Sequence, residues 1–548
     1  MLGAVSRILG IVILGLIACY LVPLAIAVYY EYFAAASHPQ PHATLVFVES
    51  ILICLGIAAL FFYFGRKSTG EIYRREALAT VVALWMFLPV LCALPFYLSK
   101  TLENPWMAYF EAVSGLTTTG ATTMQAKQYN PETGAEIPII TRIPNVIETS
   151  YSYYGTLAPI KNPASGEILA QGLEGVSRAI LFWRSFIQWL GGGGIIVLFV
   201  AILPALGAGG KVLLQSEVPG PIKESLTPRI KETAYQLWMI YLALTAIIIL
   251  LLVLTNSNLK WLDVITLTFG ALSTGGFSIH NSSVGFYESA ATDWAVIIAM
   301  LIGSINFSIY YFIWKGRFFK IFTSELAVYL AILIVTCGLA TLHLTATPDT
   351  PLQGEGSSFY TLGNAFRDST FQVVSAITTS GFSTTNYDKW PYVVQAILLL
   401  VMYVGGMSGS TAGGIKIIRH LMLFKIAQHK IESLFRPKMV RRLLIDGKEV
   451  DEGASNMVLT FFFILIAIAT LGTFAFILDG LDLETAFSAV TCMINCTGLS
   501  FRAGGPAESF AFMSDFSLFL SSLLMILGRL EFFAVLALLI PAFWRQDQ

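Results

Sequence analysis

The chain has 548 residues, of which 56% are hydrophobic and 12% are charged, and its formal net charge at pH 7 is −1. Soluble globular proteins carry about 25% charged residues, so this chain has too little charge to cover the surfaces of a water-soluble protein of its length. The near-neutral balance offers no basic surface for nucleic acid. The composition therefore excludes a soluble multidomain enzyme and a nucleic-acid-binding protein.

Ten apolar stretches are long enough to cross a bilayer, which takes about 20 residues of helix. In chain order they are 8–30, 45–64, 76–98, 178–206, 233–255, 292–314, 325–346, 391–408 with a continuation to about 424, 455–478 and 515–544. The first has no small-residue cleavage site and is closely followed by the second, so we interpret it as a retained helix rather than a signal peptide.

Four shorter segments of mixed polarity lie between these spans, at 104–116, 260–272, 363–377 and 482–494. They are too short to cross the bilayer and have the length of re-entrant half-helices. With the amino terminus inside, the inner segments hold about twice as many lysines and arginines as the outer ones. This asymmetry predicts a multi-pass protein with both termini in the cytoplasm and all four half-helices on the outer side.

Two connections between the spans are long. The outer segment 125–175, rich in Pro, Tyr, Thr and Ile, is predicted to carry a small hairpin. The inner segment 425–453 is basic and partly amphipathic. This favours an interfacial helix on anionic lipid or, as the alternative, a docking surface for a cytosolic partner.

One sequence pattern follows each half-helix. The four copies are LTTTGAT at 116–122, LSTGGFS at 272–278, ITTSGFS at 377–383 and INCTGLS at 494–500, and their aligned glycines are Gly120, Gly276, Gly381 and Gly498. Irregular backbone at membrane depth is stable only where it lines a water-filled cavity or is buried in protein. Rings of backbone carbonyl oxygens can replace the hydration shell of an alkali cation, and glycine permits the backbone conformations that such rings need.

The pattern therefore predicts a cation selectivity filter made of four loops around one axis, with the partly negative carboxyl ends of the half-helices directed at the ion. The predicted filter residues, whose backbone carbonyls would bind the ion, are Thr118, Thr119, Gly120, Thr274, Gly275, Gly276, Thr379, Ser380, Gly381, Cys496, Thr497 and Gly498. The alternative is four tight outer turns with Ser and Thr caps, which explains neither the common register nor the half-helix lengths.

This order of span, half-helix, glycine loop and span, repeated four times, resembles the Trk/Ktr/HKT family of potassium transporters over nearly the whole chain. The two extra spans before the first repeat make it most similar to the TrkH-type membrane subunits. The resemblance implies an all-α polytopic membrane protein with a potassium-channel-like, pseudo-fourfold central pore. The corresponding divisions are an N-terminal helix pair at 1–70, repeat 1 at 71–215 with the outer insertion 125–175, repeat 2 at 216–320, repeat 3 at 321–445 and repeat 4 at 446–548.

The resemblance also implies a function, namely potassium uptake across the plasma membrane through a gated, selective pore, with K+ as the transported ion and no cofactor in this chain. Glycine in all four loops accompanies potassium selectivity in this family, so Gly120 favours K+. The implied partners are membrane lipid, a second copy in a homodimer, and a cytosolic nucleotide-binding regulatory subunit of the TrkA type on inner segments such as 425–453. The chain departs from the family pattern in its fourth loop, NCTGLSFRAGG, and in the length of 125–175.

The second span of the third repeat, VGGMSGSTAGGIKIIRH at 404–420, has more glycine than a helix tolerates at about 1 kcal/mol per residue. We therefore expect a loop within the membrane. A phosphate-binding loop is the alternative for GSTAGGIK, but Ile415 separates the glycine from Lys416 and no strand precedes it. The resemblance implies that this loop lies under the filter and obstructs the pore. The predicted gating residues are Gly405, Gly406, Ser408, Gly409, Ser410, Thr411, Gly413, Gly414 and Arg529.

Arg529 is near the middle of the last span, where a charged side chain costs at least about 2.5 kcal/mol and usually faces a cavity or a partner. Glu531 is two residues further on, hence on another face of the helix. The resemblance directs Arg529 into the pore beside the loop, where it would bond to loop carbonyls. The alternative is an arginine that serves packing alone, in the surroundings of Glu531.

Three other functions compete with potassium uptake. A sodium-permeable member of the same family would share every feature above. An alternating-access carrier for another small solute would also contain broken helices, but it predicts a twofold inverted repeat. A membrane enzyme would need paired histidines or clustered acids within the spans, and the spans, with His343 near an outer end, contain no such pair. The sequence therefore indicates a transport protein rather than an enzyme.

Overall fold

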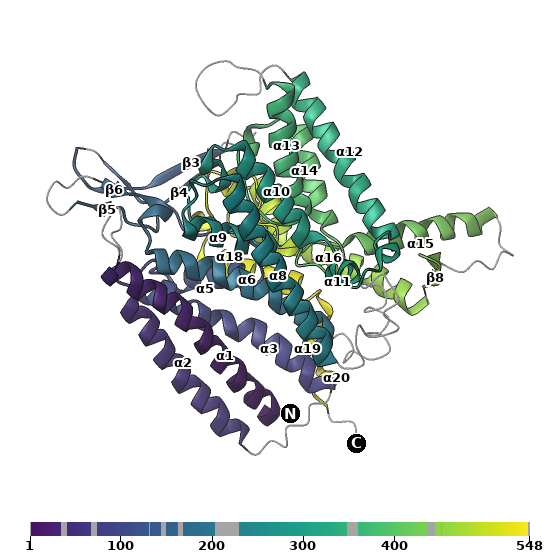
Figure 1. Cartoon of the computed structure of the whole chain (residues 1–548), viewed down its shortest axis with the longest axis horizontal. Helices are drawn as coiled ribbons and strands as arrows, with labels where there is room; N and C mark the ends of the chain where they lie inside the picture. The colour runs from purple at the N-terminus through teal and green to yellow at the C-terminus, as the bar shows by residue number, and fades with distance from the viewer. Residues whose placement is uncertain are drawn as a thin grey trace.

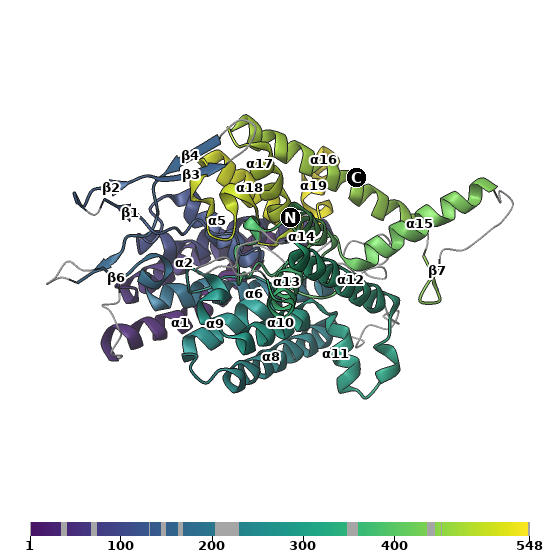
Figure 2. The same cartoon turned by 90° about the horizontal axis from the view of Figure 1, so that it is seen from above.

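The computed structural model describes residues 2–33, 41–66, 74–130, 132–143, 149–162, 168–202, 230–347, 360–435, 444–450 and 452–545. In these ranges the chain is a bundle of helices, with short hairpins at one end and helix α15 projecting at the other (Figure 1, Figure 2). Each of the ten predicted spans overlaps between one and three consecutive helices, and the predicted all-α multi-pass fold is confirmed. The predicted divisions at 70/71 and 215/216 fall outside the described residues, and the division into repeats stays a prediction.

The first two helices form an antiparallel pair (Figure 1). α1 (Leu2–Val28), extended by a π-helical turn (Tyr29–Phe33), packs against α2 (Thr44–Gly65) so closely that a Cβ atom on Gly65 would lie 2.8 Å from the backbone of Arg7. The buried ring of Tyr20 lies 4.5 Å from that of Trp183. This contact joins the pair to the first repeat.

The four repeats share one order of helices. Their first helices are α3 (Arg74–Cys92) with α4 (Leu94–Leu98), α8 (Ile230–Thr255), α12 (Ser324–Ala346) and α16 (Glu452–Leu478). Their half-helices are α5 (Pro105–Leu116), α9 (Trp261–Leu272), α13 (Leu362–Ile377) and α17 (Leu483–Asn495), and their second helices begin as α6 (Arg178–Ile202), α10 (Ala290–Ser304), α14 (Tyr392–Val404) and α18 (Asp515–Arg529). Every half-helix begins and ends within one residue of its predicted bounds. Their starts carry caps, such as Asn104 before the proline of α5 and Asp482 before α17.

Three of the second helices are interrupted. α10 meets α11 (Phe307–Trp314) at 92°, and α18 meets α19 (Phe533–Leu539), which α20 (Pro541–Trp544) follows, at 115°. Between α14 and α15 (Ile417–Phe435) lie residues 405–416, which we call the α14–α15 loop. Only this last break was expected from the sequence. The bend before α11 has a local cause, because the side chain of Asn306 accepts a hydrogen bond from the backbone of Ser308 and starts a new helix. Besides the bent pairs, six described helices are long and apolar enough to span a membrane singly.

Glycines in the second helices allow the half-helices to pack against them. A Cβ atom on Gly191 would lie 2.0 Å from the carbonyl oxygen of Leu116, the last residue of α5. The same relation holds for Gly303 with Leu272 O (2.5 Å) and Gly528 with Ile494 O (1.9 Å). The glycine run of α6 therefore serves close packing, and α6 continues through it without a break.

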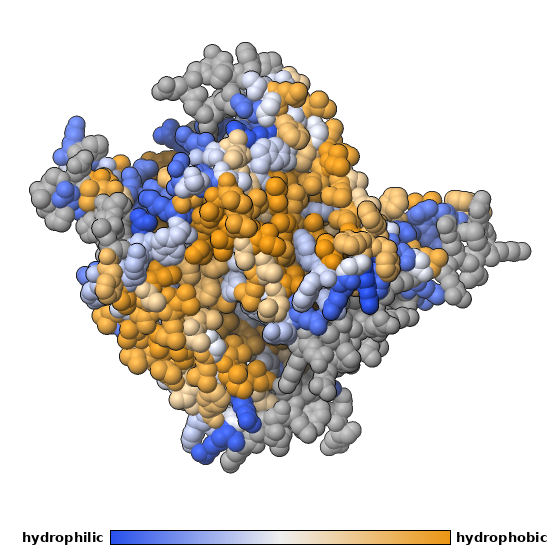
Figure 3. Space-filling view, in the orientation of Figure 1, coloured by the Kyte–Doolittle hydropathy of each residue, from blue (hydrophilic) through white to orange (hydrophobic). Residues whose placement is uncertain are grey.

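Short hairpins stand on two sides of the bundle. The insertion contains three antiparallel pairs rather than the single predicted hairpin, namely β1 (Gln128–Tyr129) with β2 (Glu136–Ile137), β3 (Ile139–Ile143) with β4 (Thr149–Tyr153), and β5 (Ile160–Lys161) with β6 (Ile168–Ala170). The inner segment contains β7 (Leu444–Ile445) and β8 (Lys448–Glu449) beside α15. Figure 3 shows a mainly hydrophobic surface over the helices, with hydrophilic side chains gathered near the hairpins, as expected for a protein whose helices face lipid.

Candidate functional site

The four glycine loops meet around one axis. We number them loop 1 (116–122), loop 2 (272–278), loop 3 (377–383) and loop 4 (494–500). A Cβ atom on the central glycine of each loop would collide with a carbonyl oxygen of the next loop, and the fourth contact returns to loop 1. The four contacts are Gly120 with Gly275 O (2.1 Å), Gly276 with Ser380 O (1.9 Å), Gly381 with Thr497 O (2.6 Å) and Gly498 with Thr119 O (2.4 Å). The loops therefore form a closed ring of backbone in which these positions have no room for a side chain.

Each loop has the same backbone conformation. The glycines have φ values of 72 to 84°, and the residues two positions earlier, Thr118, Thr274, Thr379 and Cys496, have φ values of 51 to 56°. Non-glycine residues rarely adopt this left-handed region and often do so at functional sites. A bond from the backbone N–H before each glycine to the carbonyl five residues back closes the half-helix, as from Thr119 to Ser114 at 2.8 Å. The carboxyl end of every half-helix thus leads directly into the ring.

A second set of hydrogen bonds involves the residue two positions after each glycine. In all four loops, the carbonyl at this position accepts a hydrogen bond from the preceding repeat. The bonds are Phe510 N to Thr122 O (2.8 Å), Arg184 Nη1 to Ser278 O (2.7 Å), Val284 N to Ser383 O (3.1 Å) and Tyr387 Oη to Ser500 O (2.9 Å). Every loop is thereby bound to the preceding repeat, although the type of donor differs from one loop to the next.

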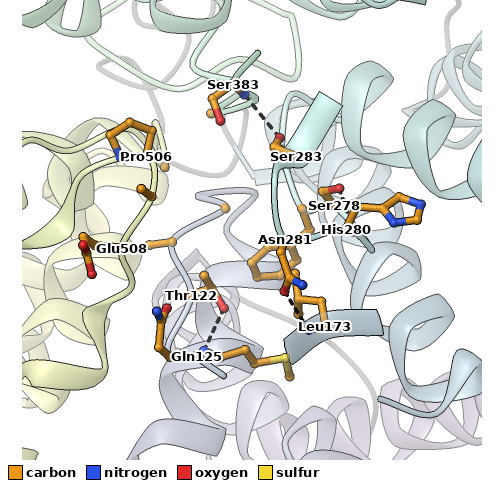
Figure 4. Close-up of a pocket in the computed structure, with 18 of the residues that line it drawn as sticks. Thr122, Gln125, Leu173, Ser278, His280, Asn281, Ser283, Ser383, Pro506 and Glu508 are labelled. Atoms are coloured by element: carbon orange, nitrogen blue, oxygen red, sulfur yellow. Dashed lines mark hydrogen bonds between the residues drawn. The ribbon is translucent and has the colours of Figure 1, made fainter. Parts of the chain in front are cut away.

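All twelve residues predicted for the filter lie in this ring. Their Thr, Ser and Cys members are at most 2% exposed, so the loops are buried in protein. Gly120, Gly381 and Gly498 are partly exposed and, with Gly276, line a cavity of about 470 Å³ on the side of the insertion hairpins. Figure 4 shows side chains from loops and connections of the different repeats around this cavity. The cavity therefore leads directly to the ring of backbone formed by the four loops.

A buried ion pair binds both the segment after loop 1 and the backbone of loop 2. Arg184 Nε lies 2.6 Å from Glu111 Oε1, and both side chains are almost fully buried. Glu111 also accepts from the backbone of Thr123 in the segment after loop 1 (3.0 Å). Four residues along α6, the amide of Gln188 donates to Gly275 O (2.6 Å) and accepts from Phe277 N (3.1 Å). Charged and polar side chains of repeat 1 therefore fix the backbone of loop 2.

A histidine lies between two carboxylates at the edge of the cavity. His280 Nε2 is 2.8 Å from Asp263 Oδ1, and its Nδ1 is 3.3 Å from Glu174 Oε1 in the insertion. Burial alone would lower the pKa of His280, but the hydrogen bonds and charges of Asp263 and Glu174 raise it above its ordinary value. His280 therefore ties the insertion, through Glu174, to the half-helix α9, through Asp263.

The α14–α15 loop lies against the ring on the side of the half-helix ends. Gly413 N donates to Thr379 Oγ1 of loop 3 (2.6 Å), and Gly414 N donates to Asn495 O of loop 4 (3.0 Å). Thr411 Oγ1 lies 2.9 Å from Leu272 O of loop 2. One irregular segment thus contacts three of the four loops.

The rest of the α14–α15 loop is fixed at the bend between α10 and α11. Met407 N donates to Ser304 O (3.0 Å), and Phe307 N donates to Gly409 O (3.0 Å). The hydroxyl of Ser410 donates to Met407 O (2.6 Å). The predicted gating glycines and hydroxyls therefore lie together in one hydrogen-bonded segment, with positive φ at Gly405, Gly409 and Gly414.

Arg529 reaches this segment from the end of α18. It is 4% exposed, and its Nη1 donates to Thr411 O at 2.9 Å. Its Nε and Nη2 have no hydrogen-bond partner among the described residues. Glu531 points elsewhere and pairs with the buried Arg419 of α15. A positive charge thus lies next to the α14–α15 loop, beneath the ring.

Several residues at the site could not be predicted from the sequence. Glu325 of α12 binds Ser408 in the α14–α15 loop, and Arg184 and Gln188 bind loop 2. In the sequence, Glu325 looks like an ordinary acidic residue in the first turn of a helix. Its burial was the missing information. Among the described residues, no group of three His, Cys, Asp or Glu side chains could hold a metal ion.

Known proteins share this architecture. A family model described as TrkH, cation transport protein, matches residues 162–545. The Trk system potassium uptake protein TrkH of Escherichia coli K12 is 31% identical to the chain, with 99% of both chains covered, and that of Halomonas elongata is 32% identical, with 91% of this chain and 92% of the relative covered. The crystal structure of the potassium transporter TrkH from Vibrio parahaemolyticus is 29% identical, covers 99% of both chains and has a TM-score of 0.79.

Proposed function

Because the chain belongs to the TrkH family of cation transport proteins, we propose that it takes up potassium through a pore whose selectivity filter is the ring of loops 1–4. The closed contact of the four glycines is the observation that carries this proposal. Backbone carbonyls around one axis can replace the hydration shell of a monovalent cation, and the carboxyl ends of the half-helices add partial negative charge. A membrane potential that is negative inside drives such an ion inward with about 2.3 kcal/mol per 100 mV.

The α14–α15 loop and Arg529 form the gate in this proposal. The loop contacts three of the four filter loops, so an ion leaving the ring meets it next. The guanidinium of Arg529 adds an electrostatic barrier to a cation, and its bond to Thr411 O holds the loop in place.

Both termini are proposed to face the cytoplasm, with the protein in the plasma membrane. The asymmetry of lysine and arginine supports this orientation. The starts of α1 and α3 also lie beside the end of the chain, where Phe543 packs against a cluster formed by Val5, Leu9 and Ala79, and Arg75 donates to the carbonyl of Arg545. Both ends of the chain therefore belong to one side of the bundle.

The proposed partners are a second copy of the chain and a regulatory subunit of the TrkA type. Relatives named as members of a Trk system support a partner. Helix α15 projects from the bundle and exposes Phe424, Leu434 and Phe435, which are 64 to 83% exposed. Such a surface calls for lipid or protein contact.

Ion flux into liposomes tests the proposal directly. Purified protein is reconstituted, and the uptake of K+, Rb+, Na+ and Li+ is compared under a negative inside potential. We expect K+ and Rb+ to enter well ahead of Na+ and Li+. If Na+ enters as fast as K+, the protein is a sodium-permeable pore and the proposed potassium selectivity is wrong. If none of these ions enters, the proposed transport function is refuted.

A further inference from the structure

The carboxyl group of Glu325 lies in the interior against the α14–α15 loop. Glu325 is the second residue of α12, and none of its surface is exposed. Its Oε1 accepts a hydrogen bond from the backbone N–H of Ser408 at 2.7 Å, and its Oε2 accepts one from the Ser408 hydroxyl at 3.2 Å. The backbone of Ile418, the second residue of α15, also interacts favourably with this carboxyl group. One side chain thus contacts the loop near its beginning and the helix that starts at its end.

An acidic residue in the first turn of a helix needs no burial to interact with the helix dipole. The first helix of repeat 4 illustrates this, because α16 begins with Glu452, whose side chain is exposed. Burying a carboxyl group is costly unless donors satisfy it. The donors that satisfy Glu325 come from the α14–α15 loop and the first turn of α15, so the favourable contacts of this carboxyl group depend on where the loop lies.

Ser408 lies in a part of the loop that hydrogen bonds hold on both sides. Its neighbours Met407 and Gly409 are bonded to the bend between α10 and α11, through Ser304 O and Phe307 N. Glu325 approaches Ser408 from α12, while Arg529 holds Thr411 three residues further along. Two buried side chains of different repeats, Glu325 and Arg529, therefore bind the same short segment.

The start of α12 is itself tied to the inner hairpin. Ser324 N donates to Asp446 Oδ1 at 3.1 Å, and the Ser324 hydroxyl bonds to the same oxygen. Asp446 lies in the turn between β7 and β8 and is exposed. Glu325, which binds the loop, is therefore adjacent to Ser324, which binds the β7–β8 hairpin.

We propose that Glu325 is a positioning residue of the gate, which holds the α14–α15 loop against the filter and links its position to the β7–β8 hairpin. The inference rests on the proposed function, because it requires the loop to obstruct the pore. The hydrogen bonds of Glu325 go to Ser408 and not to the ring, so Glu325 acts on the gate through Ser408. Its loss should therefore change how often the pore is open and leave the choice between ions unaltered.

Rb+ and Na+ uptake by purified full-length protein in liposomes, without a partner protein, tests the proposal. Glu325→Gln keeps the size of the side chain but replaces one of its two oxygens by an NH2 donor, so one of the two bonds from Ser408 is lost. A hydrogen bond of a buried group is worth up to roughly a factor of ten in an equilibrium, so we expect Rb+ uptake to rise about tenfold with an unchanged Rb+/Na+ ratio. Ser408→Ala, which removes only the hydroxyl contact, should raise uptake less. The double variant should not exceed Glu325→Gln, because both changes remove the same interaction.

Two further variants complete the test. Glu452→Gln removes an exposed carboxylate at the corresponding helix start and should leave uptake unchanged. Asp446→Asn alters an exposed residue, so it folds even where Glu325→Gln does not, and it should raise uptake by a smaller factor. A variant that merely damaged the fold would lower uptake, whereas loss of a positioning contact raises it.

A loop variant separates failure of this inference from failure of the gate itself. Deleting residues 408–411 should raise uptake if the loop obstructs the pore. If this deletion raises uptake while Glu325→Gln and Asp446→Asn leave it at the wild-type level, the role of Glu325 is refuted and the gate stands. If the deletion also leaves the uptake of well-folded protein unchanged, the loop is no gate and the proposed gating mechanism fails.

Discussion

Replacing the filter glycines one at a time should damage ion selectivity in an order set by the structure. A Cβ atom would lie 1.9 Å from the facing carbonyl oxygen at Gly276, 2.1 Å at Gly120, 2.4 Å at Gly498 and 2.6 Å at Gly381. Real Cβ atoms essentially never approach closer than 3.0 Å. Serine at 276 must therefore displace a carbonyl of loop 3 by about 1 Å, and serine at 381 by less than half of that.

Two free-energy costs combine in these variants. The left-handed conformation of each glycine costs a residue with a side chain about 1–2 kcal/mol, and this part is similar at all four positions. The collision with the next loop differs between positions and acts on an oxygen of the ring. Selectivity depends on the spacing and number of the coordinating carbonyls. The Rb+/Na+ uptake ratio should therefore fall most in Gly276→Ser, less in Gly120→Ser and Gly498→Ser, and least in Gly381→Ser.

The assay is the uptake of Rb+ and Na+ by each reconstituted variant, together with its melting temperature. Gly134→Ser is the matched control, because Gly134 also has a positive φ of 66° but has nothing within 4 Å of its Cβ position. It should lose a little stability and keep the wild-type ratio. Folded variants with an unchanged Rb+/Na+ ratio at all four ring positions would refute the assignment of the ring as the filter.

Three further changes test other parts of the site. Arg529→Gln removes a positive charge and the bond to Thr411 O, so Rb+ uptake should rise about tenfold or more; a lower uptake by folded protein would contradict its role in the gate. The raised pKa of His280 means that its stabilising contribution is complete below pH of about 6.5, the ordinary value, and is lost as the pH rises through the raised pKa. The difference in melting temperature between wild type and His280→Gln should therefore shrink as the pH is raised, and a constant difference would exclude the ionic contact. Tyr387→Phe leaves the carbonyl of Ser500 without its donor, which should destabilise the protein by about 1–3 kcal/mol; a loss of selectivity as large as in Gly276→Ser would show that this bond belongs to the filter itself.

The sequence predicted the half-helices and the common register of the loops because both depend on local properties. A stretch of about 12 mixed residues between two long apolar spans has few structural solutions in a bilayer. Capping residues such as Asn104 and Asp482 mark where the half-helices begin. The four glycine motifs needed only alignment with one another, and their meeting around one axis follows from repetition.

Contacts between distant residues could not be predicted in the same way. Glu325 and Ser408 are 83 residues apart, and neither residue type indicates the other. The bend between α18 and α19 lies in a stretch that is apolar on both sides, where hydropathy predicts a single span. The bend turns Glu531 toward Arg419 of α15, so the partner of Glu531 became evident only from the tertiary structure.

The ring shows why sequence repetition is confined to so few positions. In the proposed filter, an ion that is surrounded evenly requires the same backbone conformation in all four loops, and only glycine satisfies both the positive φ and the close contact with the next loop. Two residues further on, the carbonyl of each loop only needs a donor. A backbone N–H, an arginine, a second backbone N–H and a tyrosine hydroxyl supply it in turn. In the proposed filter, the ion path restricts residue identity at the glycines, whereas the bonds from the preceding repeat restrict only geometry, so their donors are free to differ between repeats.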